Sequence, residues 1–478
     1  MSHKITVTDK FSGEVVAEVK ADSREDLQRK IDLAYQARDR VKRWPWEKRA
    51  ELARSVGERI CQHREEFVRL LVREAGQARK FAEFEVDRAT TIASGFDRIL
   101  DLVRPRQIPA RTGQNLLVYE PYGVAAIMTP RNTPLVVPVY TLLSGLGAGN
   151  AVVMRPSLVA PLNTLRLVEL VRAEVCPEDA VQVSTCAGEE AAREFIENPK
   201  VGVLVAYASS PVGKDNLIKM GRFLEGTRKI RNGLLCIDGM MTKYVPELAG
   251  NDAFLVLPGA DLEKAVEAAV QGGFANAGQL CISAKRLIVD RAMAEEFKER
   301  LRSAVSRLKV GDPFDPQTDI GPIGRRETLQ VASYHVEEAL EKGGRLVFGG
   351  QSREPFFYPT LIELDKGLIL GRERDEKPFL WVEESFAPVR SMVAYDDLEE
   401  AIALARDGHY GLGAAIFGPP SLALEVAARI DAGRIIINES PLYGDLSLPI
   451  GGVKDSGLYG ATDKILEMTY MKRIHIGV

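Results

Sequence analysis

Short apolar runs alternate with longer amphipathic runs along most of this chain, and this alternation limits the folds available to it. Residues 115–130 are apolar and strand-like, residues 135–146 have a helical pattern, and residues 151–156 form another short apolar run. The same order returns after residue 253, and the first hundred residues have a helical pattern that opens with a capping-box-like spacing of Ser23 and Asp26. Strands separated by helices at this spacing are typical of a parallel sheet covered by helices. We therefore predict an α/β protein whose ligands bind beyond the carboxyl ends of its strands.

Length and charge narrow the class of protein. A chain of 478 residues exceeds a single hydrophobic core, so we expect two α/β domains with a cleft between them. The 63 basic and 67 acidic residues are well mixed, which leaves no basic face for a nucleic acid. No apolar run reaches the length of a membrane span, about 18 residues. We expect neither a nucleic acid nor a membrane as a partner.

Cysteine usage points to a reducing compartment. The five cysteines are scattered without a C-x-x-C pair, which argues against a disulfide framework and against a metal site. The first residues, MSHKITVTDKFSGE, lack the apolar core of a signal peptide. We expect a cytoplasmic protein, in which thiols stay reduced.

One cysteine and one glutamate are candidates for chemistry. Cys281 lies in NAGQLCISA, just before a strand-like run, although a lone cysteine of this kind is more often packing than catalysis. None of the histidines stands in a nucleophile-like setting, so a carboxylate is the better candidate for a base. Glu247 lies in YVPELAGND, where desolvation would raise its pKa toward the range of a general base. Taken alone, a glutamate in such a run is more often an ordinary loop residue.

Several segments together resemble the aldehyde dehydrogenase superfamily of the NAD(P)-dependent, hydrolytic type. The separation of Glu247 and Cys281 is that of the family, and the resemblance runs from about residue 5 to the C-terminus. In family order, the matching segments are MTPRNTPL, VVMRPS, ELAGND, FANAGQLCISAKRLIV, GDPFDPQTDIGPI, EESFAPV, YGLGAAIF and PIGGVKDSG.

This resemblance implies a domain organisation. It places a Rossmann-like cofactor-binding domain at residues 1–102 and 122–248 and a catalytic domain at residues 249–462. Residues 103–121 and 463–478 would form a small β oligomerisation element. Because exposed strands need a partner edge, we expect a homodimer or a homotetramer.

The resemblance also implies a reaction on a small aldehyde. Cys281 would attack the carbonyl carbon as a thiolate, and the Asn132 amide with the Cys281 backbone N–H would bind the oxyanion. Hydride transfer to the nicotinamide would leave a thioester, which Glu247 would hydrolyse by activating water. The product would be a carboxylic acid.

The cofactor residues come from the same resemblance. Glu384 and Phe386 correspond to the neighbours of the nicotinamide and its ribose, and Arg155 to a contact with the adenosine ribose. Ser209 corresponds to a serine at a helix N-terminus beneath the pyrophosphate. The full set is Thr129, Pro130, Arg155, Ser209, Val212, Glu384 and Phe386.

Departures from the family pattern bear on specificity. Leu158 stands where many NAD-selective members carry a glutamate, and its loss removes repulsion against a 2′-phosphate that Arg155 could pair with. We therefore hypothesise that NADP is accepted at least as readily as NAD. Leu280 and Ile282 flank the cysteine, which favours an uncharged or aromatic aldehyde. Arg131, in place of an aromatic residue, could act as a compensating cation for an anionic substrate.

An insertion and two alternative functions remain open. The chain is longer between Ser209 and Glu247 than the family needs, with the surplus around residues 223–241. This segment is either a surface excursion or a flap over the cofactor or substrate site. A CoA-acylating enzyme is the nearest alternative function, although such members generally lack the base glutamate. A catalytically idle cofactor-binding or structural homologue is the alternative from another class.

Overall fold

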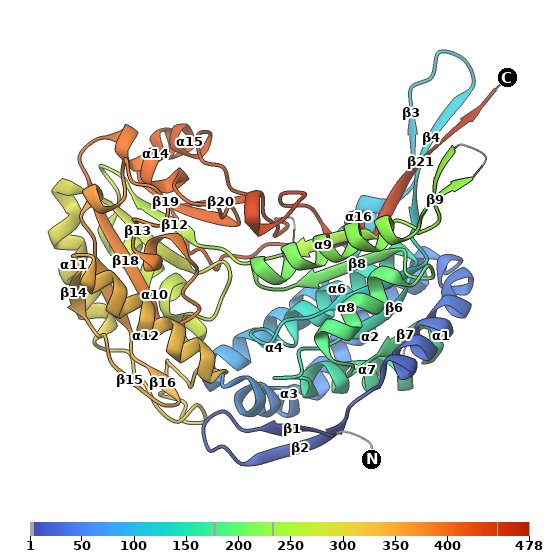
Figure 1. The fold of residues 1–478 in the computed structure, drawn as a ribbon, viewed down its shortest axis with the longest axis horizontal. Coiled ribbons are helices and arrows are strands. Elements are labelled where there is room, and N and C mark those ends of the chain that lie inside the picture. The colour runs from blue at the N-terminus through green and yellow to red at the C-terminus, as the bar shows by residue number, and fades with distance from the viewer. Residues whose placement is uncertain (1–3, 175–177, 232–233, 447, 478) are drawn as a thin grey trace.

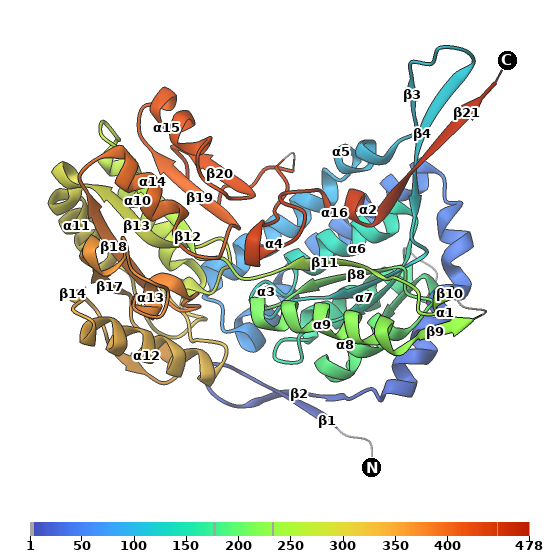
Figure 2. The same cartoon turned by 45° about the horizontal axis from the view of Figure 1, so that its top comes forward.

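Two large sheets covered by helices organise the molecule, and a small sheet projects away from them (Figures 1 and 2). This computed structural model describes residues 4–174, 178–231, 234–446 and 448–477. The predicted α/β fold with parallel sheets is confirmed. None of the helices in these ranges is both long enough and apolar enough to cross a bilayer.

The first sheet has five parallel strands in the order β11–β8–β5–β6–β7. The chain runs outward from β5 through β6 to β7, then continues on the other side of β5 with β8 and β11. This reversal creates a topological switch point beside β5, where ligands bind in open α/β sheets. The strands are β5 (Val124–Met128), β6 (Ala151–Arg155), β7 (Val181–Val183), β8 (Val203–Tyr207) and β11 (Lys243–Glu247).

The helices of this half include the helical region predicted for the first hundred residues. At the start of α1 the capping box is present: the Asp26 N–H donates to Ser23 Oγ at 3.1 Å, and the Ser23 N–H donates to Asp26 Oδ2 at 3.0 Å. The helices are α1 (Arg24–Lys42), α2 (Trp46–Gln62), α3 (Arg64–Leu70), α4 (Arg79–Ser94), α5 (Asp97–Leu100), α6 (Val136–Ala148), α7 (Leu162–Glu174), α8 (Gly188–Glu197) and α9 (Ser210–Gly226), with a π-helical turn at Leu71–Ala75.

A hairpin at the N-terminus corrects the purely helical expectation for this region. Strands β1 (Lys4–Thr8) and β2 (Val15–Lys20) pair antiparallel before α1 begins. Both strands are short and largely exposed, so they contribute few of the buried apolar residues by which a strand is recognised in a sequence.

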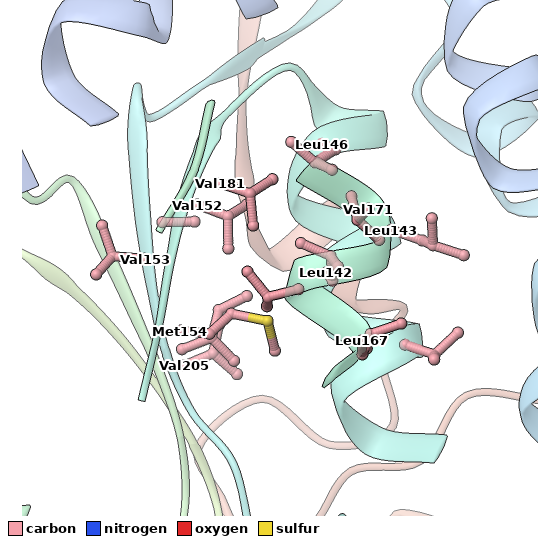
Figure 3. Close-up of a cluster of buried hydrophobic side chains, with 14 of the residues drawn as sticks. Leu142, Leu143, Leu146, Val152, Val153, Met154, Leu167, Val171, Val181 and Val205 are labelled. Carbon is pink, nitrogen blue, oxygen red and sulfur yellow. The ribbon is translucent and has the colours of Figure 1, made fainter. Parts of the chain in front are cut away.

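Buried apolar side chains fix the helices to the first sheet. Val152 and Met154 of β6 point toward α6 and α7, whereas Val153 points to the opposite face (Figure 3). Leu142 of α6 and Val171 of α7 are buried against them. Because burying one such side chain stabilises the fold by about 1.5–3 kcal/mol, this layer holds β5 and β6 firmly at the edge where the candidate site begins.

The second sheet has seven strands in the order β14–β17–β18–β13–β12–β19–β20. Neighbouring strands are parallel except for β14 and β17. The strands are β12 (Asp252–Val256), β13 (Ala284–Asp290), β14 (Arg345–Phe348), β17 (Thr360–Glu363), β18 (Val389–Tyr395), β19 (Gly413–Phe417) and β20 (Arg434–Ile437), and β15 (Ser352–Arg353) pairs separately with β16 (Phe356–Phe357). The helices are α10 (Leu262–Phe274), α11 (Arg291–Val305), α12 (Arg326–Glu341), α13 (Phe379–Val382), α14 (Leu398–Arg406) and α15 (Pro420–Ala427).

The small sheet joins two segments that are far apart in the sequence. Strand β4 (Gln114–Pro121) lies between β3 (Arg106–Ile108) and the C-terminal β21 (Thr469–Ile476). A single turn of helix, α16 (Lys464–Glu467), leads directly into β21. All three strands project from the body in both views (Figures 1 and 2). Their role in oligomerisation and the domain boundaries given above remain predictions.

The inserted segment forms a hairpin at the C-terminal end of α9. Strands β9 (Arg228–Arg231) and β10 (Leu234–Ile237) pair antiparallel, and they lie at the opposite end of the molecule from the second sheet in both views (Figures 1 and 2). None of the described residues of this hairpin lines the cavity described below. The structure therefore contradicts a flap over the cofactor or substrate site and supports a surface excursion.

Candidate active site

The carboxyl edge of the first sheet carries four of the predicted positions. Thr129 follows β5, Arg155 ends β6, Ser209 follows β8 and Glu247 ends β11. Backbone hydrogen bonds align these ends: the Thr129 N–H donates to the Arg155 carbonyl at 3.0 Å, and the Ala208 N–H donates to the Glu247 carbonyl at 3.1 Å. Parallel strands end at one edge, so side chains distant in sequence converge at the switch point.

A loop with unusual backbone geometry carries Cys281. Asn276, Ala277 and Gly278 follow α10 with φ values of 51°, 54° and 71°. Left-handed conformations cost a non-glycine residue about 1–3 kcal/mol and concentrate at functional sites. A side chain at Gly278 would place its Cβ 2.4 Å from the Ala387 carbonyl oxygen, so this position requires glycine. The loop delivers Cys281 just ahead of β13.

The Cys281 thiol is subject to opposing electrostatic effects. Burial raises its pKa to about 12, while the nearby Lys285 ammonium favours the thiolate. Lys285 Nζ donates to the Cys281 carbonyl at 2.7 Å and lies 3.0 Å from Glu384 Oε1. Sequence reasoning missed Lys285. A usable signal existed, since a lysine in an otherwise apolar, strand-like run needs a polar partner if that strand is buried.

Asn132 is held with one side-chain N–H available. Its Nδ2 donates to the Gln279 carbonyl at 2.9 Å, and its own carbonyl accepts from Gln77 and Asn276, each at 3.0 Å. A side-chain amide carries two donors, so the second N–H of Asn132 can serve an oxyanion. Asn132 lines the same cavity as Cys281.

Glu247 is buried against a lysine that was not predicted. Its carboxylate forms an ion pair with Lys464 Nζ, which is also 2.6 Å from Glu467 Oε2. Burial raises the pKa of Glu247 to about 7, Lys464 lowers it and Glu467 raises it. Lys464 lies more than two hundred residues further along the chain. Its sequence surroundings gave no sign of this contact.

All ten predicted site residues line one cavity of about 1000 Å³, and their roles in catalysis and cofactor binding remain predictions. The Arg155 guanidinium donates from Nε to the Cys186 carbonyl at 3.0 Å and lies against Gly188 at the start of α8. Glu384 Oε1 accepts from the Gly250 N–H at 3.3 Å. The ten residues are Thr129, Pro130, Asn132, Arg155, Ser209, Val212, Glu247, Cys281, Glu384 and Phe386.

Arg131 and Arg88 bring cationic groups to the cavity wall. Arg131 donates to Gln279 Oε1 at 2.8 Å and to Thr328 Oγ1 at 3.2 Å, and its guanidinium lies 5.3 Å from the Phe386 ring centroid. Arg88 donates to the Gly444 carbonyl. Much of the remaining wall is apolar, and these residues include Phe81, Phe84, Ile92, Val136, Val137, Leu280, Ile282, Leu442, Leu446, Leu448 and Ile450.

Comparison with known proteins shows the family to which this chain belongs. The model of the aldehyde dehydrogenase family matches residues 1–474. This chain therefore belongs to the aldehyde dehydrogenase family, and the resemblance found in the sequence is confirmed.

Two curated relatives cover nearly the whole chain. The lactaldehyde dehydrogenase of Methanocaldococcus jannaschii is 31% identical over 477 residues, covering 98% of this chain and 96% of that protein. The 3-sulfolactaldehyde dehydrogenase of Priestia aryabhattai is 30% identical over 465 residues, covering 95% and 91%.

Solved structures agree over the same extent. Glyceraldehyde-3-phosphate dehydrogenase GapN from Methanocaldococcus jannaschii, complexed with NADP, is similar with a TM-score of 0.89 and 31% identity, covering 100% of both chains. Aldehyde dehydrogenase 21 from Physcomitrella patens, in complex with the reaction product succinate, is similar with a TM-score of 0.89 and 26% identity, covering 100% of this chain and 95% of that one.

Proposed function

We propose that this protein oxidises an aldehyde to a carboxylic acid through a thioester on Cys281, with NADP or NAD as the hydride acceptor. The observation that carries this proposal is the convergence of Cys281, Asn132 and Glu247 on the cavity that also holds the predicted cofactor residues. A nucleophile, an oxyanion donor and a base are the three groups that acyl transfer needs within reach of one substrate.

The chemistry follows from these side chains. The Cys281 thiol releases its proton to solvent, and a bond forms between Sγ and the aldehyde carbon as the carbonyl π electrons move to oxygen. The free N–H of Asn132 and the Cys281 backbone N–H stabilise the oxyanion. A nicotinamide held beside Glu384 and Phe386 would supply the hydride acceptor for that carbon. Glu247 then takes a proton from water as the water oxygen attacks the thioester, and the C–S bond breaks to release the acid and restore the thiol.

The residues at the carboxyl edge of the first sheet suit a dinucleotide. Helix α9 starts at Ser210 with backbone N–H groups unpaired by a side-chain cap, which favours a diphosphate. Arg155 and Ser157 line the cavity, and residue 158 is an uncharged leucine. A relative of known structure binds NADP. These observations support acceptance of NADP at least as readily as NAD.

The apolar wall supports an uncharged or aromatic aldehyde as the substrate. Leu280 and Ile282, on both sides of the nucleophile, belong to this wall. The names of the relatives favour a second candidate, a small hydroxylated or anionic aldehyde. Arg88 is a cation of the cavity wall that could serve such a substrate.

The alternative functions have weaker support. Glu247 is retained and buried at the cavity, which disfavours transfer of the acyl group to CoA. An idle homologue would have no need to keep nucleophile, oxyanion donor and base together. The unpaired thiols Cys61, Cys186, Cys236 and Cys281 suit a reducing compartment, and we propose the cytoplasm.

A turnover screen tests the function and the specificity together. Benzaldehyde, lactaldehyde and succinate semialdehyde are each offered with NADP and with NAD, in the presence and absence of CoA, and acid formation is measured. We expect CoA-independent turnover, the highest kcat/KM with benzaldehyde, and values for NADP at least equal to those for NAD. CoA-dependent turnover would overturn the hydrolytic reaction, and C281A that still consumed aldehyde would overturn the covalent one.

A further inference from the structure

Three charged side chains meet in the interior beside the cavity. Lys464, the first residue of α16, forms ion pairs with Glu247 and Glu467. Their side chains are 1%, 7% and 3% exposed, respectively. Lys464 Nζ also lies 3.4 Å from the carbonyl oxygen of Ile450, a residue of the cavity wall. One ammonium therefore links the candidate base to the C-terminal segment.

The charges of this cluster are unbalanced. A buried charge is costly unless it is paired, and one ammonium can neutralise only one of two carboxylates. Burial raises the pKa of both Glu247 and Glu467, and Lys464 opposes the rise in each. Since the carboxylates share this partner, they titrate as a coupled pair.

Other ionisable groups surround the cluster without replacing Lys464. The Tyr140 hydroxyl lies 3.4 Å from Asp463 Oδ1, and burial holds the pKa of Tyr140 and of Tyr207 above the usual range, so both stay neutral. Burial lowers the pKa of Lys243, and among the described side chains Lys464 is the cation that forms an ion pair with Glu247. The ionisable groups facing the cluster are Tyr140 from α6, Tyr207 from β8, Lys243 from β11, and Tyr459 and Asp463 from the segment before α16.

The base is also tied to this segment through its backbone. Glu247 forms a bridge with Gly457, and the next residue, Leu248, donates its N–H to the Ser456 carbonyl at 3.0 Å. Backbone and carboxylate are thus both attached to residues 456–467, which precede the projecting strand β21.

We propose that Lys464 and Glu467 set the resting position and the proton affinity of the Glu247 carboxylate, with Lys464 as a positioning residue for the base. This inference rests on the proposed function, in which Glu247 accepts a proton from water. That proton brings the buried cluster from one excess negative charge to neutrality, and Glu467 remains as the partner of Lys464. Uptake of the proton is therefore favoured at the moment the thioester is hydrolysed.

Opposite shifts in a pH profile test this proposal. In single turnovers, absorbance of the reduced cofactor reports hydride transfer, and rapid quenching reports acid release. In the wild-type protein, the rate of carboxylic acid release should fall as the pH drops through about 7, where Glu247 becomes protonated. The midpoint of this fall is the acid limb of the profile. Lys464→Met should move that limb upward by about one unit or more, because an opposite charge lowers a carboxyl pKa by about 1–3 units. Glu467→Gln should move it downward, and Lys472→Met, a change of an exposed lysine on β21, should not move it.

The controls separate this proposal from the proposed function. Glu247→Gln should keep hydride transfer and lose acid release, and if acid release persists, Glu247 is not the base and the proposed function is at fault. If Glu247→Gln behaves as expected but both cluster variants give the wild-type profile, the positioning role is overturned. Glu467→Gln leaves a balanced ion pair, so it carries the test even where Lys464→Met fails to fold. A merely structural role would lower stability without these opposite shifts.

Discussion

Cys281, the proposed nucleophile, lies in an environment that opposes ionisation of its thiol. Burial outweighs the Lys285 ammonium, and the pKa of the Cys281 thiol rises to about 12. The resting residue is therefore a thiol, which resists adventitious oxidation and alkylation, since the thiolate is the reactive form. We therefore expect the thiol to ionise only when substrate and cofactor bind.

Alkylation kinetics test this view of Cys281. In the protein without cofactor, its reaction with iodoacetamide should accelerate about tenfold per pH unit up to at least about pH 9, because the thiolate fraction rises tenfold per unit below the pKa. Site-resolved mass spectrometry measures the rate, with the exposed Cys61 as a reference for the reagent. A rate for Cys281 that levels off near neutral pH would contradict a thiol that is protonated at rest.

Asn132 provides a second test at the scale of one residue. Asn132→Ala should lower kcat by about 10²–10³-fold, the usual cost of losing one oxyanion donor. The KM for the cofactor should stay close to that of the wild-type protein, because the Asn132 amide is bonded to the Gln279 carbonyl and not to a predicted cofactor residue. Steady-state kinetics measure both. A kcat close to the wild-type value would remove Asn132 from the oxyanion site.

Sequence reasoning reached Cys281, Glu247 and Asn132 but not their charged partners. The three stand in recognisable local segments, and each segment follows or precedes a strand of a predictable sheet. Lys464 acts through contacts made in three dimensions, and nothing in its neighbouring residues distinguishes it from a surface lysine. Lys285 lies in an apolar, strand-like run, which is the one signal that could have identified it. Buried ion pairs between distant segments are therefore the part of the site that the sequence could not supply.

At the scale of elements, the β9–β10 hairpin is an insertion whose described residues lie outside the cavity lining. It extends α9 at the end opposite to its cavity-lining N-terminus. One of its faces presents Ile230, Leu235 and Ile237, all strongly exposed. An isolated hairpin of this size is marginally stable, so its stability depends on its attachment to α9.

Removal of this hairpin should be neutral for catalysis. Deleting residues 226–239 should leave KM for aldehyde and cofactor within about twofold of the wild-type values. The reason is that none of the described residues in this segment lines the cavity, so the contacts that bind both substrates are kept. Kinetics with both substrates measured at fixed enzyme concentration check this. A substantial rise in either KM would support a flap over the site, which the position of the hairpin contradicts.

Most helices and strands could be predicted because their apolar residues repeat at a clear spacing. Strands β5, β6 and β8 are continuous apolar runs, which is what burial on both faces requires. The β1–β2 hairpin escaped because its short strands are largely exposed. The hairpin in the insertion was not predicted because its apolar residues face solvent, so their pattern carried no information about a core.

At the scale of the whole molecule, the projecting β3–β4–β21 sheet presents open strand edges. Strand β21 is exposed along nearly its whole length, and exposed edges invite pairing with another chain. We expect a homodimer or homotetramer assembled through this sheet.

Light scattering after size exclusion tests this assembly. The full chain should elute as two or four copies of the 52.6 kDa protomer. Deleting residues 469–478 should abolish that assembly, because β4 then loses eight residues of paired edge. A full-length protein that is monomeric at micromolar concentration would contradict the expectation. An unchanged oligomer after the deletion would place the interface elsewhere.

The pairing of β4 with β21 also determines how late in translation this sheet can form. The ribosome completes β21 about 350 residues after β4, a delay of roughly 20–70 s at 5–20 residues per second. Throughout that interval β4 has an unpaired edge, and Glu247 lacks the ammonium of Lys464. Cys281, Glu247 and the predicted cofactor residues are all translated before α16, which supplies Lys464. The nascent chain thus carries its predicted catalytic groups before the segment that completes their surroundings.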